Sequence, residues 1–185
     1  MKTKDIVNIS LFTTLLAVCS WICIPTVVPF TMQTFAVFLA MLVLGGKKGT
    51  IVIGIYMILG MIGVPVFSRG TAGIGVLFGA TGGYIIGWIF IGILLIILEN
   101  MERRMGEKIF PYMNILRASG LITGLIICYL FGTFWFLNVY AKESVNTGFW
   151  SVVSVCVFPF IIPDFIKLVL AHTVSRRIKK YIGNV

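Results

Sequence analysis

This sequence has few charged residues and almost no histidine. Only 11% of its 185 residues are Asp, Glu, Lys or Arg, and histidine occurs once, as His172. One histidine excludes a histidine metal cluster, and no Ser-His-Asp triad with a plausible partner can be drawn around it. We expect His172 to pack at a membrane interface. The supply of residues therefore excludes most enzyme classes, and we predict no catalytic residue and no metal ligand.

Nucleotide-binding motifs are also missing. GKKGT at residues 46–50 lacks the GxxxxGK[ST] spacing of a phosphate loop. GxGxxxG at residues 73–79 departs from the dinucleotide fingerprint and lies outside any βαβ unit. None of the four cysteines has CxxC spacing, so we expect them to be apolar packing residues. We therefore expect no nucleotide site in either glycine-containing segment.

Apolar residues dominate what is present. They make up 59% of the chain, and a spanning helix needs roughly 20 of them. This composition predicts an all-α membrane protein: a bundle of six transmembrane helices forming one integral-membrane domain, residues 1–185, in the cell membrane. A re-entrant hairpin around the basic turn Gly45–Lys48 is the alternative to two full spans there. The predicted spans are Ile6–Ile24, Gln33–Leu44, Gly49–Gly63, Tyr84–Leu98, Ile115–Val139 and Phe149–Thr173.

The basic residues predict the orientation, because Lys and Arg in short loops stay cytoplasmic. With both termini inside, only Arg69 and Lys142 lie outside and Lys167 lies within the membrane. We therefore attribute the net charge of +9 to the basic residues that set the membrane orientation and that can contact anionic lipid. We predict no nucleic-acid binding. The basic residues predicted to be cytoplasmic are Lys2, Lys4, Lys47, Lys48, Arg103, Arg104, Lys108, Arg117, Arg176, Arg177, Lys179 and Lys180.

Asp164 and Lys167 are the exception to an otherwise uncharged last span. An ionisable residue at membrane depth costs at least about 2.5 kcal/mol by insertion scales. Residues at i and i+3 share a helix face, so the two side chains either neutralise each other or hold a polar ligand. Pro163 is expected to kink or break the helix near it, and a restarted helix would place Asp164 in its first turn.

Two further segments carry candidate ligand contacts. Gly63–Trp88 contains eight glycines, and backbone of this kind is tolerated near a membrane where it is buried in protein or lines a cavity. We predict an extracellular glycine-rich loop between the third and fourth helices, which acts as a lid. Gln33 lies beside Thr31 and Thr34 in an apolar helix. Its buried side-chain amide therefore needs a hydrogen-bond partner, either protein backbone or a ligand.

Several of these motifs resemble one family. The chain contains VPFTMQTFAVFLA at 28–40, GVPVF at 63–67, GATGGYIIGW at 79–88 and PDFIK at 163–167. In this order they resemble the BioY family, the biotin-specific substrate-binding subunit of energy-coupling-factor (ECF) vitamin transporters. Ala80 departs from the family's usual proline. The resemblance implies a bundle that captures biotin from outside, needs no cofactor, and associates with a transmembrane coupling protein and two ATPase subunits.

The resemblance also implies a set of site residues. Biotin offers ureido N–H donors, a carbonyl, an apolar ring and chain, and a carboxylate. Asp164 suits the N–H donors and Lys167 suits an oxygen, but the sequence leaves open which end each one holds. Apolar walls are expected from Phe35, Phe67 and Trp88 or Tyr84. The predicted substrate-binding residues are Asp164, Lys167, Tyr84, Gln33, Thr81, Gly82, Gly83, Phe67 and Gly73.

Thr13 and Ala17 in the first span are spaced as small-xxx-small, which lets another helix approach closely. We predict that they dock the coupling subunit. Three alternatives stay open at this point: a subunit for another vitamin such as thiamin or riboflavin, an intramembrane enzyme or channel, and an Asp164–Lys167 pair that only fixes packing.

Overall fold

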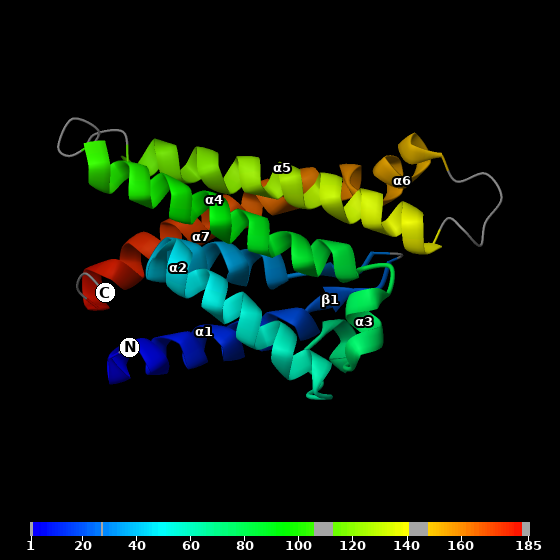
Figure 1. Ribbon diagram of the computed structural model, residues 1–185, viewed down its shortest axis with the longest axis horizontal. Helices are drawn as coiled ribbons and strands as arrows, with labels where there is room; N and C mark the ends of the chain where they lie inside the picture. Colours follow the sequence, from blue (N-terminus) through cyan, green and yellow to red (C-terminus); the bar gives the residue numbers. More distant parts are fainter. Residues whose placement is uncertain (1, 27, 106–112, 141–147, 183–185) are drawn as a thin grey trace.

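The computed structural model describes residues 2–26, 28–105, 113–140 and 148–182, and nearly all of them are helical (Figure 1). By length and composition, four segments of the described chain could cross a membrane: Gln33–Met61, Gly82–Met105, Ile115–Val139 and Phe149–Lys180. The predicted all-helical class is therefore confirmed. The elements are α1 (Thr3–Trp21), β1 (Cys23–Ile24), β2 (Phe30–Thr31), α2 (Gln33–Met61), η1 (Ser68–Gly70), α3 (Ile74–Phe78), α4 (Gly82–Met105), α5 (Met113–Tyr140), α6 (Phe149–Cys156) and α7 (Phe158–Ile182).

Helix α2 folds back on itself at the predicted basic turn. Gly45 has φ 82°, a left-handed value that glycine adopts without strain. Gln33 and Tyr56 are hydrogen-bonded across this turn, although a straight helix would separate residues so far apart in sequence by about 34 Å. Glu99 of α4 accepts the Gly46 N–H at 2.9 Å and so satisfies a backbone donor where the second half of α2 begins.

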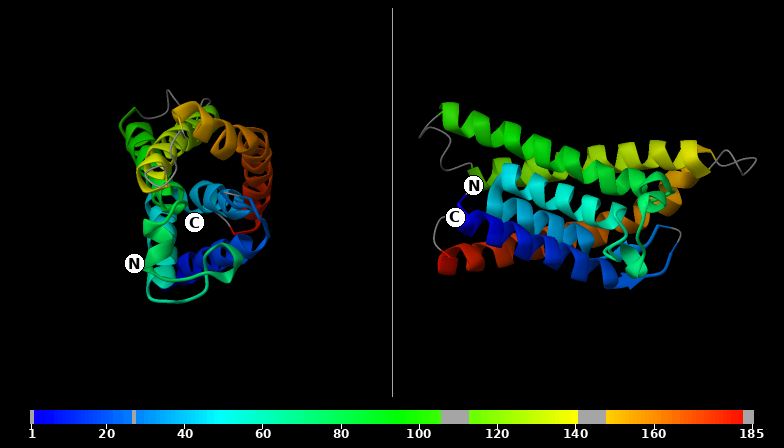
Figure 2. Two further views of the ribbon diagram at one scale, coloured as in Figure 1. Left: turned by 90° about the vertical axis from the view of Figure 1, so that its right-hand side faces the viewer. Right: turned by 60° about the horizontal axis from the view of Figure 1, so that its bottom comes forward.

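The first half of α2, residues 33–44, is the central helix of the molecule. Every residue in it is buried except the half-buried Phe35. A helix that is apolar on all sides belongs in a core, and α1, α4 and α7 all pack against α2 (Figure 2). Gly49 lets the two halves of α2 approach closely, because a Cβ atom there would lie 2.6 Å from Met41 Sδ. This arrangement places the Gln33 end of the central helix inside a ring of helices.

The glycine-rich segment is more ordered than a loop. It contains η1 and α3, and its last third begins α4 at Gly82. Low helix propensity suggested a loop here, but close packing overrides it. A Cβ atom at Gly82 would lie 1.7 Å from the Leu77 carbonyl oxygen, and one at Gly83 would lie 2.3 Å from Trp135 Cβ. The first part of the segment is fastened by Ser20 and Tyr56, whose hydroxyls both donate to the Val66 carbonyl.

The helix does not restart at Pro163, so the predicted place of Asp164 in the first turn of a restarted helix is wrong. Helix α7 continues through Pro163, and the break lies at Val157 (φ −123°, ψ −56°), between α6 and α7. With the break there, Pro159 falls in the first turn of α7, where backbone N–H groups lack helical partners anyway. Pro163 has no backbone N–H, so a single helical hydrogen bond is missing at this position. Asp164 consequently lies in the second turn of α7 and not in its first.

Both chain ends lie at the same end of the bundle, together with the turn of α2, the end of α4 and the start of α5 (Figure 1). The basic residues of these elements therefore gather there. Two ion pairs support this end: Lys48–Asp5 at 2.7 Å and Arg117–Glu102 at 2.9 Å. Lys108 and Lys142 lie outside the described residues.

Candidate functional site

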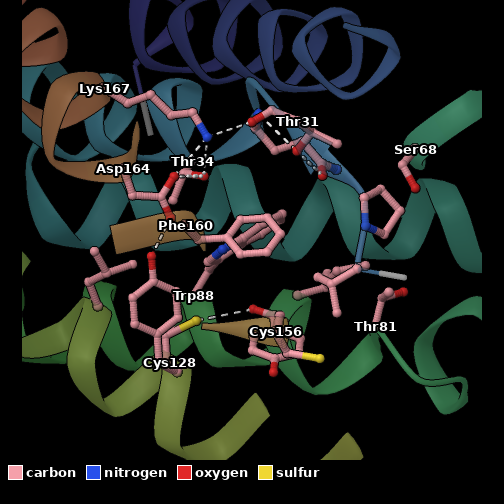
Figure 3. Close-up of a pocket in the computed structure, with 17 residues that line it drawn as sticks. Thr31, Thr34, Ser68, Thr81, Trp88, Cys128, Cys156, Phe160, Asp164 and Lys167 are labelled. Carbon is pink, nitrogen blue, oxygen red and sulfur yellow. Dashed lines mark hydrogen bonds and ion pairs between the residues drawn. The ribbon is translucent and has the colours of Figure 1, made fainter. Parts of the chain in front are cut away.

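A cavity lies at the Gln33 end of the central helix, away from the two termini (Figure 3). It is enclosed by the segment leading into α2, by α4 and α5, and by α6 and α7. Its wall combines apolar and aromatic side chains with a few polar ones, which is the usual make-up of a small-molecule site. The lining residues are Val28, Pro29, Thr31, Gln33, Thr34, Ser68, Thr81, Tyr84, Ile85, Trp88, Leu125, Cys128, Tyr129, Cys156, Phe160, Asp164 and Lys167.

Asp164 and Lys167 form a buried ion pair on this wall. Lys167 Nζ lies 2.7 Å from Asp164 Oδ1, and each residue is only 3% exposed. The ammonium also donates to the Thr31 carbonyl at 2.7 Å and to Thr34 Oγ1 at 3.5 Å. It lies 4.2 Å from the centroid of the Phe30 ring, within the range of a cation–π contact. An ammonium has three protons, so the long contact to Thr34 is the one most easily exchanged for a ligand oxygen.

The Asp164 carboxylate is held from two further helices. Thr34 of α2 donates to Oδ1 at 3.1 Å, and Tyr129 of α5 donates to Oδ2 at 2.5 Å. Each carboxylate oxygen can accept two hydrogen bonds. Oδ1 is therefore saturated by Thr34 and Lys167, while Oδ2, beside Tyr129, keeps capacity for one more N–H donor. Charged hydrogen bonds of this kind are the strong ones.

Gln33 finds its partners within the protein and still lines the cavity. Its Nε2 donates to the Tyr56 hydroxyl at 2.5 Å, and its Oε1 accepts from Thr31 Oγ1 at 2.8 Å. Each end of the amide keeps one further hydrogen-bonding position. Gln33 can therefore satisfy protein groups and a ligand at the same time.

The structure brings together five of the residues predicted to bind substrate: Gln33, Thr81, Tyr84, Asp164 and Lys167 all line the cavity, and so does the expected wall residue Trp88. Tyr84 OH lies 3.4 Å from Thr133 Oγ1.

The other predicted residues do not line the cavity. Gly82 and Gly83 are buried helix-packing positions, and Phe67 is fully buried against Gly60. Gly73 precedes α3 with φ 99°, and Phe35 is half-buried on the central helix. None of these five is among the residues that line this cavity.

Tyr129 is the residue whose role the sequence did not reveal. It lies within an apolar span, where its hydroxyl needs a partner once buried, and that need was the available signal. The partner, Asp164, is 35 residues away, and only the packing of α5 against the site identifies it. Phe30 and Phe160 were missed as well, because apolar residues are too common in this chain to stand out.

The two predicted docking residues differ in exposure. Thr13 is 4% exposed, and its hydroxyl donates to the Ile9 carbonyl within α1. Ala17 is half-buried, while Leu11, Thr14 and Val18 form the exposed side of α1. Ala17 is thus nearer than Thr13 to the surface that a partner helix could reach. Separately, no group of three or more His, Cys, Asp or Glu side chains able to hold a metal occurs among the described residues.

Comparisons with known proteins agree with one another. A model of the BioY family matches residues 1–184. A biotin transporter BioY of Thermotoga maritima is 38% identical over 181 residues, covering 96% of each chain. A probable biotin transporter BioY of Pyrococcus horikoshii is 34% identical, covering 97% of this chain and 98% of its own.

A solved structure is similar over the same length. The crystal structure of the S-component for biotin from an ECF-type ABC transporter aligns with a TM-score of 0.76 at 26% identity, covering 97% of this chain and 95% of that one. The cavity, its buried acid–base pair and these alignments over nearly the full length lead to one conclusion: the chain belongs to the BioY family.

Proposed function

We propose that this protein is the biotin-capture subunit of an ECF uptake transporter and is not an enzyme. The observation that carries the proposal is the buried Asp164–Lys167 pair on the wall of a cavity. Charges at this depth need a reason to be there. The relatives' names supply the ligand, since they are biotin transporters and an S-component for biotin.

The hydrogen-bonding capacity of the site supports one orientation of biotin. The remaining acceptor position on Asp164 Oδ2 suits a ureido N–H. The Lys167 ammonium, by giving up its long contact to Thr34, suits the ureido carbonyl. Trp88, Ile85 and Phe160 then provide apolar contacts for the thioether ring and the valeryl chain.

The proposal includes a topology of six transmembrane segments: α1, the two halves of α2, α4, α5, and α6 together with α7. Both termini lie in the cytoplasm, because most basic residues gather at that end. The glycine-rich segment then lies outside, where Ser68 and Thr81 reach the cavity and the segment acts as a lid.

The proposed partners are a transmembrane coupling protein and two ATPase subunits, because the sequence contains no nucleotide-binding motif of its own. Helix α1, near Ala17, is the proposed docking face. Replacing Ala17 with Trp should reduce complex assembly and uptake while leaving biotin binding intact. Loss of biotin binding instead would contradict this docking site.

Equilibrium binding of labelled biotin to the purified protein tests the proposed function. We expect saturable binding that excess unlabelled biotin displaces and that excess thiamin or riboflavin does not. Displacement by thiamin or riboflavin would instead support a subunit for another vitamin, and absence of any vitamin binding would refute the capture function.

A further inference from the structure

Tyr56 lies outside the cavity but contacts a residue that lines it. It is completely buried in the second half of α2, with the rings of Phe67 and Trp88 centred 5.5 Å and 6.3 Å from its own. Its hydroxyl bonds two segments at once, because it donates to the Val66 carbonyl at 2.9 Å and accepts from Gln33 Nε2 at 2.5 Å. Tyr56 thus joins the glycine-rich segment to the cavity wall.

The direction of these hydrogen bonds follows from the chemistry of the groups. The Val66 carbonyl can only accept, so the single hydroxyl proton of Tyr56 is committed to it. The Tyr56 oxygen is then an acceptor toward Gln33, and it must face the amide nitrogen. Turning the amide by 180° would place Gln33 Oε1 against another acceptor. At the other end, Thr31 Oγ1 donates to Oε1 at 2.8 Å.

We propose that Tyr56 is a positioning residue that fixes the orientation of the Gln33 amide and thereby contributes to ligand discrimination. With the amide held, its second N–H and the second lone pair of Oε1 are presented at fixed places on the wall. Such a donor–acceptor edge is complementary to an N–H next to a C=O, as in a cyclic urea or amide. This inference rests on the proposed function only for the identity of the ligand.

The chain offers a matched control. Ser20 is also fully buried, and its single hydroxyl proton is shared between the carbonyls of Ala17 and Val66, at 2.6 Å and 2.5 Å. Its hydroxyl also contacts the Tyr56 hydroxyl but not Gln33, so Tyr56 keeps its own bonds to Val66 and Gln33 when Ser20 is truncated. Ser20→Ala therefore removes one anchor of the glycine-rich segment without releasing the amide. Tyr56→Phe releases the amide, keeps the ring packing, and leaves Ser20 as donor to Val66. The two variants separate orientation of the amide from anchoring of the segment.

A measurement on the amide itself needs no ligand. Gln33 is the only glutamine in the sequence, so ¹⁵N-glutamine labelling with scrambling suppressed gives one side-chain NH₂ signal pair in NMR spectra. We expect Tyr56→Phe to shift this pair and speed its hydrogen exchange about 3- to 10-fold, as for the loss of one hydrogen bond. Ser20→Ala should leave both unchanged. Equal effects of the two variants, or none for Tyr56→Phe, would overturn the positioning role.

Binding provides the second measurement. The ratio of the Kd for 2-iminobiotin, which lacks the ureido carbonyl, to the Kd for biotin should fall about 3- to 10-fold in Tyr56→Phe and stay unchanged in Ser20→Ala. An unchanged ratio in Tyr56→Phe, with wild-type binding intact, would contradict the role in discrimination. Failure of the wild-type protein to bind biotin would instead refute the proposed function, and the NMR result would still decide the positioning role.

Discussion

Two ion pairs of this molecule have the same residue types and the same length but lie in opposite surroundings. Lys167–Asp164 and Lys48–Asp5 both join nitrogen and oxygen at 2.7 Å. The side chains of the first pair are 4% exposed each, whereas those of the second are 28% and 20% exposed. Since distance cannot distinguish the pairs, burial and neighbouring groups must account for any difference in their roles.

The neighbours of the two pairs differ as well. Thr31, Thr34 and Tyr129 supply hydrogen bonds to the buried pair from three segments, so it is part of a network on the cavity wall. The exposed pair joins the start of α1 to the turn of α2, at the end of the bundle away from the cavity. We therefore propose that the first pair binds the ligand, and we expect the second to make only a minor contribution to helix packing.

Breaking the buried pair should have the largest effect. Lys167→Met and Asp164→Asn are each expected to weaken biotin binding at least about tenfold, which is roughly 1.4 kcal/mol. Lys167→Met should also lower the free energy of unfolding by about 3–5 kcal/mol, because it leaves a buried carboxylate without its cation. Titration with labelled biotin and thermal unfolding in detergent measure the two effects. Unchanged affinity in both variants would mean that the pair only fixes packing.

The double variant Asp164→Asn with Lys167→Met sharpens the comparison. Removing both charges should restore about 1–4 kcal/mol of stability relative to Lys167→Met alone, since no unpaired charge remains buried. Biotin affinity should not recover, because the ligand has lost both partners. Recovery of affinity together with stability would show that the single variants act through misfolding and not through ligand contacts.

The sequence was sufficient to predict the features of the molecule that are rare in a membrane. Two charges in an apolar span and a Gly-Gly-Lys-Lys turn have few alternative explanations, and the structure places the first on a cavity wall and the second where α2 folds back. These features are local, so they can be identified without knowing the fold.

The features that depend on tertiary packing could not be predicted in the same way. Gly82 and Gly83 have low helix propensity, and only the close approach of Leu77 and Trp135, which leaves no room for a Cβ atom, explains why glycine occupies the start of this helix. The break at Val157 precedes both prolines of α7, and nothing about valine marks it. The role of Tyr129 likewise depends on the packing of α5 beside α7, which brings its hydroxyl to Asp164.

Arg117–Glu102 is intermediate between the two lysine pairs, because its side chains are 28% and 6% exposed. Two parallel contacts of 3.2 Å and 2.9 Å join them. Arg117→Met is expected to lower the free energy of unfolding by about 1 kcal/mol, as for a bidentate pair at a partly exposed site. Biotin affinity should be unchanged, since the pair is at the far end of the bundle. A tenfold loss of biotin affinity would show that this end of the bundle does affect binding at the cavity, contrary to our expectation.

Asp5→Asn should have the smallest effect, and that effect should depend on pH. The hydrogen bond from Lys48 is the main cause that lowers the pKa of Asp5 below its ordinary value of 3.8. A lowered folded-state pKa contributes stability above the unfolded value, and the contribution is lost as pH falls through the folded value. The small difference in Tm between wild type and Asp5→Asn at pH 7 should therefore begin to shrink as pH falls below about 3.8 and vanish once pH is below the lowered folded-state pKa, with biotin affinity unchanged throughout. A difference in Tm that persists at lower pH would mean that Asp5 acts through packing and not through its charge.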